Sequence, residues 1–232
     1  MRPVRNYTLP RAADADGIAT SQTPGAAGDL TLDGALVSGG EAVIRQTGKD
    51  SSGRPYSRHG QLATITSAGD DSGRTFTVYG TDAEGNTRTE EITGANAGAA
   101  TGVVYWSSVT RIAVDAATAG AVTAGIAVTG AFGIVPVDHY IGDGIALAVI
   151  ISDTMTYTVE NTQDNIWAQT YRDGWQWRPE TGNWLDHGSA DFVSATASAD
   201  GNYQFVPAAT RCKWSAWTSG TIEQQVISAR SC

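Results

Sequence analysis

The sequence predicts an all-β protein in which two β-sandwich domains follow an extended N-terminal arm. Three observations support this fold class. Short segments that alternate apolar and polar residues recur at similar spacing, with glycine-containing turns between them. The 232 residues include 27 glycines and only 17% charged residues, a composition typical of proteins rich in β-turns. No window combines the apolar spacing and the caps of a long helix.

The first predicted element is the extended arm, residues 1–28. It contains three prolines and many small residues without a sustained apolar period, which favours an extended chain over a packed element. Its first twelve residues carry Arg2, Arg5 and Arg11 and no acid, whereas the whole chain has a net charge of −9. Two interpretations remain open: a basic arm that docks on the acidic surface of a neighbouring subunit, or an ordinary disordered terminus.

The first domain is predicted over residues 29–131. Strands are expected in the order 30–32, 61–66, 75–79, 87–93, 102–106, 108–114 and 121–130. The clearest pair is 75–79 and 87–93, because two alternating segments flank a glycine-containing turn and therefore predict a hairpin. Short strands at this spacing favour a sandwich over a parallel sheet with crossover helices.

The second domain is predicted over residues 132–232, where aromatic residues become dense. Six of the seven tryptophans lie in it: Trp167, Trp175, Trp177, Trp184, Trp214 and Trp217. Strands are expected at 145–152, 155–160, 191–198, 211–220 and 221–228. We expect each domain to be a jelly-roll or immunoglobulin-like sandwich.

Composition argues against two classes of partner. A nucleic-acid binder sets lysines and arginines against phosphates, but this acidic chain has only two lysines, Lys49 and Lys213. The longest wholly apolar run, residues 145–151, is far shorter than the roughly 20 residues that span a bilayer. The basic N-terminus is not followed by an apolar region, so we expect no secretory signal and no membrane partner.

Polar clusters do not predict an enzyme, a metal site or a cofactor. The acidic turns at 69–73 and 82–86 lack the alternating acids and the final glutamate of an EF-hand loop, so we interpret them as hairpin turns. Asp186 and His187 lie beside Trp184, yet adjacent strand residues point to opposite faces, and no nucleophile motif accompanies them. We therefore expect no catalytic residues.

Two cysteines, Cys212 and Cys232, are too few for a disulfide framework and lack metal-ligand spacing. One interpretation is a pair of free thiols in a reducing compartment. The other is a disulfide that tethers the C-terminal residue. A thiol assay distinguishes the two.

The tryptophan-rich segment 166–184 is the candidate contact region of the second domain. Trp175 and Trp177 are two residues apart and would share one face of a strand, with Trp184 nearby. These rings would either fill a sandwich core or form a protein interface, and exposed rings would also suit stacking on a glycan. Together with the three arginines of the arm, these tryptophans are our candidate interface residues.

Several segments resemble a module of tailed-bacteriophage virion proteins. The pattern of a strand, "GTDADGN", "TE", "TGANAG", an aromatic residue and "VTxI" matches residues 80–86, 89–92, 93–98 and 105–112. In the second half, "TMTYTVENTQDN", "WLDH", "SADGNYQFVPAATR" and "SGTIEQQVIS" are similar to a small phage particle module. Segment 166–183 has no counterpart in that pattern.

This resemblance implies a non-enzymatic virion structural protein that is assembled in the bacterial cytoplasm. The function we expect is a capsid cement or decoration protein that contacts the major capsid protein and neighbouring copies of itself, as a homotrimer or dimer. The alternatives are a neck or tail component, and a surface module that binds a host glycan through Trp175, Trp177 and Trp184.

Overall fold

The computed structural model describes residues 4–137, 144–167 and 177–228. Apart from two single-turn 3-10 helices, η1 (Pro179–Thr181) and η2 (Ala190–Phe192), every regular element in these ranges is a β-strand, so the all-β prediction is confirmed. The chain forms two compact units. The N-terminal unit comprises Arg11–Thr47 and Arg58–Ala131, and the C-terminal unit comprises Met1–Pro10, Gly48–Ser57 and Phe132–Cys232.

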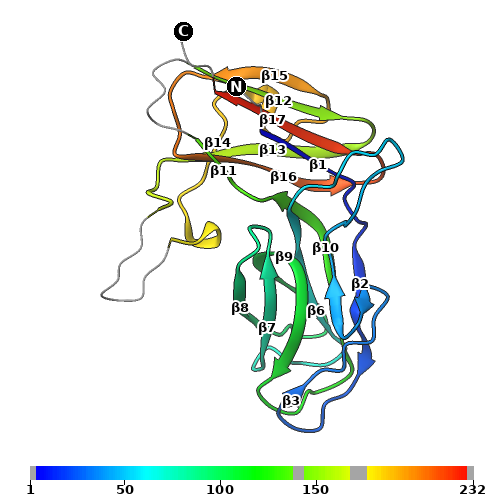
Figure 1. The fold of residues 1–232 in the computed structure, drawn as a ribbon. Coiled ribbons are helices and arrows are strands. Elements are labelled where there is room, and N and C mark those ends of the chain that lie inside the picture. The colour runs from blue at the N-terminus through cyan, green and yellow to red at the C-terminus, as the bar shows by residue number, and fades with distance from the viewer. Residues whose placement is uncertain (1–3, 138–143, 168–176, 229–232) are drawn as a thin grey trace. The chain divides into compact units, whose positions relative to one another are not determined.

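The N-terminal unit is organised around one long strand (Figure 1). Its strands are β2 (Asp14–Gln22), β3 (Gly28–Asp29), β4 (Val37–Ser38), β5 (Glu41–Val43), β6 (His59–Ser67), β7 (Thr75–Asp82), β8 (Thr87–Thr93), β9 (Ala99–Val114) and β10 (Val122–Phe132). Strand β9 pairs with β6, β5 and β3 in succession along one edge and with β7 along the other. Its sixteen residues therefore connect most of the unit's strands.

The β7–β8 hairpin forms as predicted, because β7 alternates between buried and half-buried residues and β8 between buried and exposed ones. Gly85 in the turn has a φ of +90°, a conformation that side chains with a Cβ rarely adopt. Asp82 ends β7 and accepts the Asn86 N–H at 2.7 Å and the Arg88 guanidinium at 2.7 Å. The acids of the predicted turn thus serve the hairpin itself.

Strand β8 turns one carboxylate inward, toward β9. The Glu90 carboxylate is buried and accepts hydrogen bonds from the N–H groups of Val103 and Val104 and from the Trp106 indole. Gly102 makes this approach feasible, since a Cβ there would lie 2.5 Å from a Glu90 oxygen. Glu90 is therefore a structural link between β8 and β9.

The C-terminal unit is a β-sandwich. Its strands are β1 (Val4–Thr8), β11 (Val135–Pro136), β12 (Ile145–Ile151), β13 (Met155–Thr162), β14 (Leu185–Asp186), β15 (Ala199–Tyr203), β16 (Ala209–Trp217) and β17 (Ile222–Ser228). One sheet has the order β1-β17-β12-β15 (Figure 1). The strands β14, β13, β16 and β11 pair with one another on the opposite side of the core. The core between them includes Leu147, Tyr157, Trp214 and Val226.

The predicted free arm is wrong for the described part of residues 1–28. Residues 4–8 form β1, which pairs antiparallel with β17 from Val4 opposite Val226 to Thr8 opposite Ile222. Strand β2 pairs with β10. The prolines bracket these strands rather than keep the chain unpaired, and the pairing buries Tyr7 and Thr8.

The predicted strand at 191–198 is also wrong. That segment contains η2 and an irregular stretch with one isolated bridge, from Ala195 to Tyr157. The edge strand is instead β15, whose sequence ADGNY resembles a turn. The predicted boundary after residue 131 coincides with the division between the two units, whereas residues 1–10 and 48–57 belong to the C-terminal unit.

Candidate functional site

The sheet β1-β17-β12-β15 turns one face to the core and the other face outward. We call the latter the outer face; its exposed or half-exposed side chains are Arg5, Ala146, Ala148, Ile150, Asp200, Asn202, Glu223, Gln225 and Ile227. Register places Ala146 opposite Ile227 and Ala148 opposite Gln225. Ile150 and Ile227 remain 46% and 39% exposed. This face therefore has an apolar stripe along β12, with polar side chains on the neighbouring strands β15 and β17.

One end of the outer face is covered by residues 48–57. Tyr7 projects from β1 and stacks on Tyr56 with ring centroids 5.8 Å apart. The Arg54 guanidinium lies 4.0 Å from the Tyr7 ring centroid and 3.3 Å from the Glu223 carboxylate. Burial raises the pKa of Tyr7, so its hydroxyl stays protonated at neutral pH. The contacts hold the 48–57 segment on β1 and β17.

The three arginines of the predicted interface have different surroundings. Arg2 lies outside the described residues. Arg5 is exposed on β1 and belongs to the outer face. Arg11 donates from Nε to the Ile44 carbonyl at 2.7 Å, and burial lowers its pKa. Arg11 is therefore anchored in the N-terminal unit.

The described tryptophans of the predicted interface, Trp177 and Trp184, are held by hydrogen bonds within the C-terminal unit. Trp175 lies outside the described residues. Trp177 is only 7% exposed and donates to Asp164 at 3.1 Å, and Trp184 donates to the Pro179 carbonyl at 2.7 Å. The Arg211 guanidinium lies 4.0 Å from the Trp184 ring centroid. A glycan could not stack on Trp177 without displacing these contacts.

Asp164 holds the described C-terminal part of this segment, residues 177–184. Its carboxylate accepts the Asn183 N–H at 2.7 Å and the Asn183 side-chain amide at 3.1 Å, in addition to the Trp177 indole. The Asn183 backbone hydrogen bond is the main cause of a lowered Asp164 pKa. The ionised carboxylate is therefore the form that stabilises the segment.

We expect acid to release the segment around Trp177 and Trp184. Because the folded pKa of Asp164 is depressed, its contribution is complete above the unfolded value of about 3.9 and is lost as pH falls through the folded value. Near-ultraviolet circular dichroism should show an acid transition that Asp164→Asn lacks, since an asparagine does not titrate. An identical transition in both proteins would contradict the assignment.

Asp186 and His187 do not form a catalytic pair. Asp186 is exposed, whereas the His187 ring is buried with its centroid 4.6 Å from Phe192 and 4.7 Å from Tyr203. His187 Nδ1 accepts the Ser189 N–H at 3.0 Å. Burial lowers the His187 pKa, which favours the neutral ring at pH 7.

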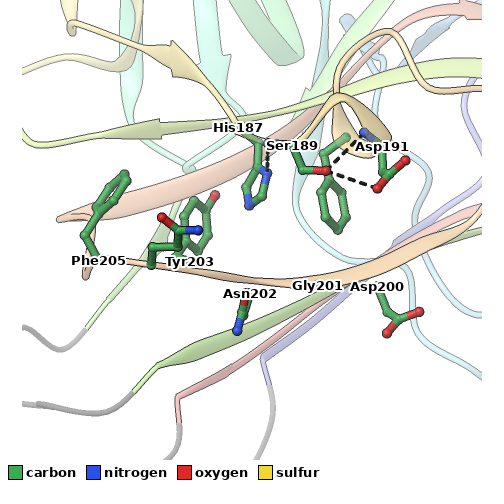
Figure 2. A pocket seen from close by; sticks show the side chains of 11 residues that line it. His187, Ser189, Asp191, Asp200, Gly201, Asn202, Tyr203 and Phe205 are labelled. Atoms are coloured by element: carbon green, nitrogen blue, oxygen red, sulfur yellow. Dashed lines mark hydrogen bonds between the residues drawn. The ribbon is translucent and has the colours of Figure 1, made fainter.

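A cavity of about 410 Å³ lies beside this histidine (Figure 2). It is bounded by residues 187–189, by Asp191 and Phe192, and by residues 200–205. Figure 2 shows His187, Tyr203 and Phe205 on one side of the β15 ribbon and Asn202 on the other. Burial raises the pKa of Tyr203 to about 12, so its hydroxyl stays neutral and bonded to Thr210 at 2.8 Å. Sequence patterns did not indicate this cavity, because its walls come from separate segments.

The remaining candidate groups are structural where they are described. Cys212 is a free thiol on the inner face of β16, and burial raises its pKa strongly; its proposed partner, Cys232, lies outside the described residues. Glu160 is buried, and its carboxylate accepts hydrogen bonds from the Arg211 guanidinium, at 2.7 Å, and from the Lys213 ammonium group. Among the residues that the structure describes, no group of three or more histidine, cysteine or acidic side chains is arranged to hold a metal ion.

Comparisons with models of known families, with curated proteins and with solved structures found no match. In the described ranges, no helix has the length and apolarity to cross a membrane. Function therefore has to be inferred from the described surfaces of the chain, of which the outer face and the cavity beside β15 are the two candidates considered below.

Proposed function

We propose that this chain is a non-enzymatic structural protein of a tailed-bacteriophage virion, acting as a cement or decoration protein that stabilises the head. The observation that carries the proposal is the outer face of the C-terminal unit. Its apolar stripe contains Ala146, Ala148, Ile150 and Ile227, and the polar side chains beside it are Asp200, Asn202, Glu223, Gln225 and Arg5. An apolar centre within a polar rim is the usual composition of a stable protein interface.

The geometry of this face suits a flat protein partner. Ala146 and Ala148 are small, so another surface can approach the β12 backbone closely, and the two isoleucines supply larger apolar side chains beside them. We expect the major capsid protein to cover this face when the chain is bound. The sequence resemblance to phage virion modules supports the same class of partner.

Buried acids of the chain support a scaffold role. Glu90 and Glu160 both lie in the interior and both have their carboxylate oxygens occupied by hydrogen bonds between strands. Their arrangement holds strands together and offers no free carboxylate pair to a substrate. A cement protein acts through its surface rather than through such a pair, so we expect purified chain to show no turnover.

Copy number per particle tests the proposed location. Quantitative mass spectrometry of purified virions that contain this chain should give a copy number comparable to the number of capsomers, since a cement protein repeats over the whole shell. A copy number that matches a single ring would favour the neck or tail component instead. Absence from purified virions would overturn the proposal.

A further inference from the structure

Among the strands that the structure describes, β15 is the last of its sheet, and the hydrogen-bond register shows which of its backbone groups point outward. Ser152 donates its N–H to the Thr221 carbonyl at 3.1 Å, which continues the β12–β17 ladder by one pair. In an antiparallel sheet, the backbone groups of successive residues point alternately to the two neighbouring strands. Those of Ala146, Ala148 and Ile150 therefore bond to β17. Those of Ile145, Leu147 and Val149 bond to β15. Their β15 partners are Tyr203, Gly201 and Ala199. The backbone groups of Asp200 and Asn202 therefore face the open edge.

A groove follows this open edge. The cavity beside His187 adjoins a second hollow of about 380 Å³ that is bounded by Asp191 and by residues 195–200. Both hollows are lined by Asp191 and Asp200, so they meet along the edge of β15. Five strand residues extend about 17 Å, which is the length that an added strand would need.

The inner wall of the groove is aromatic and rigid. Phe192 packs so tightly on Gly201 that a Cβ there would lie 2.9 Å from the ring. His187 Nε2 is buried and makes no hydrogen bond of good geometry. The Asn202 backbone lies close enough to the His187 ring to favour its protonated form. Phe205 is 52% exposed at one end. An apolar side chain entering here would contact these rings.

Charge distinguishes between the candidate occupants. Asp191 and Asp200 contribute negative charge, and the described lining of both hollows contains no lysine or arginine. Pairing of β15 with β15 of a second copy would bring together two sets of these acids, which disfavours a symmetric dimer through this edge. A segment with basic side chains would instead meet opposite charge.

We propose that the β15 edge binds an extended segment of a partner protein as an added strand, with apolar residues directed toward His187, Phe192 and Phe205 and a lysine or arginine beside Asp200. The Asp200 and Asn202 backbone groups form the ladder with the bound segment, as in other cases of strand addition. Aromatic contacts select the apolar positions, and the acids select the basic ones. Asp200 and Asn202 lie opposite Ala148 and Ala146, so this site borders the apolar stripe of the outer face. The inference does not depend on the virion role.

The test uses the full chain and a blocked eight-residue peptide of alternating valine and lysine. Titration followed by 15N nuclear magnetic resonance should shift the amide signals of Asp200 and Asn202 saturably. A peptide with alternate backbone amides N-methylated cannot complete the ladder, and a peptide with glutamate in place of lysine meets like charge. Each should bind at least about tenfold more weakly, a difference of about 1.4 kcal/mol.

Two variants separate binding from folding. Asn202→Pro removes one outward N–H at an edge position and should abolish lysine-peptide binding. Asp200→Lys changes only an exposed side chain and should reverse the preference toward the glutamate peptide, so the proposal remains testable even if the proline variant is unstable. Equal binding of all three peptides, or no saturable shift, would overturn the proposal. Shifts caused by a neutral saccharide such as maltose, with none from peptides, would assign the cavity to a glycan instead.

Discussion

Replacing Glu90 with alanine should destabilise the N-terminal unit by about 3–5 kcal/mol, because the change removes the acceptor of three buried donors and leaves a void between β8 and β9. The N–H groups of Val103 and Val104 and the Trp106 indole have no alternative acceptor among their described contacts. Glu90→Gln keeps the volume and one carbonyl oxygen, so its effect should be intermediate.

Urea denaturation and hydrogen exchange of the β8 and β9 amides measure this effect. The matched control is Glu91→Ala, since Glu91 is the adjacent residue on the same strand but is exposed. A surface change of this kind typically alters stability by no more than about 0.5 kcal/mol. Equal midpoints for the Glu90 and Glu91 variants would show that the buried carboxylate does not link the two strands.

A charge in the centre of the outer face should weaken binding to assembled shells. Ala148→Glu and Ile150→Glu each place a carboxylate on the apolar patch, where a covering partner would have to desolvate it without a cation. We expect each variant to bind assembled shells at least about tenfold more weakly, which corresponds to about 1.4 kcal/mol.

The control for these variants is Leu185→Glu. Leu185 is 62% exposed and lies on β14, which belongs to the opposite sheet of the same unit. The same chemical change there should leave shell binding unaffected, and all three proteins should unfold at similar temperatures. Equal loss of binding in Leu185→Glu would indicate a general effect of charge rather than an interface at the outer face.

Local alternation predicted the hairpin of β7 and β8 correctly, because each strand has one buried face and one exposed face. The pairing of β1 with β17 was not predictable in this way, since it joins Val4 to Val226 across almost the whole chain and the five residues of β1 are flanked by prolines. Only the tertiary partner makes that segment a strand rather than an arm.

The candidate site was predicted less completely than the fold. Residues 145–151 are apolar throughout, so the sequence indicated a strand but not which side chains face outward. Glu90 and Glu160 could not be assigned from sequence, because their donors lie on other strands. The tryptophan-rich segment drew attention by composition, yet Trp177 is buried, and the cavity lies instead between β15 and the residues around His187.

Binding of the unmodified chain to assembled capsid shells, compared with binding to dissociated capsid subunits, tests the central claim most directly. In a sedimentation assay with increasing concentrations of chain, we predict saturable binding to shells and markedly weaker binding to subunits, because a cement protein contacts more than one subunit at a time. Equal binding to both forms, or binding to neither, would contradict the proposed cement function.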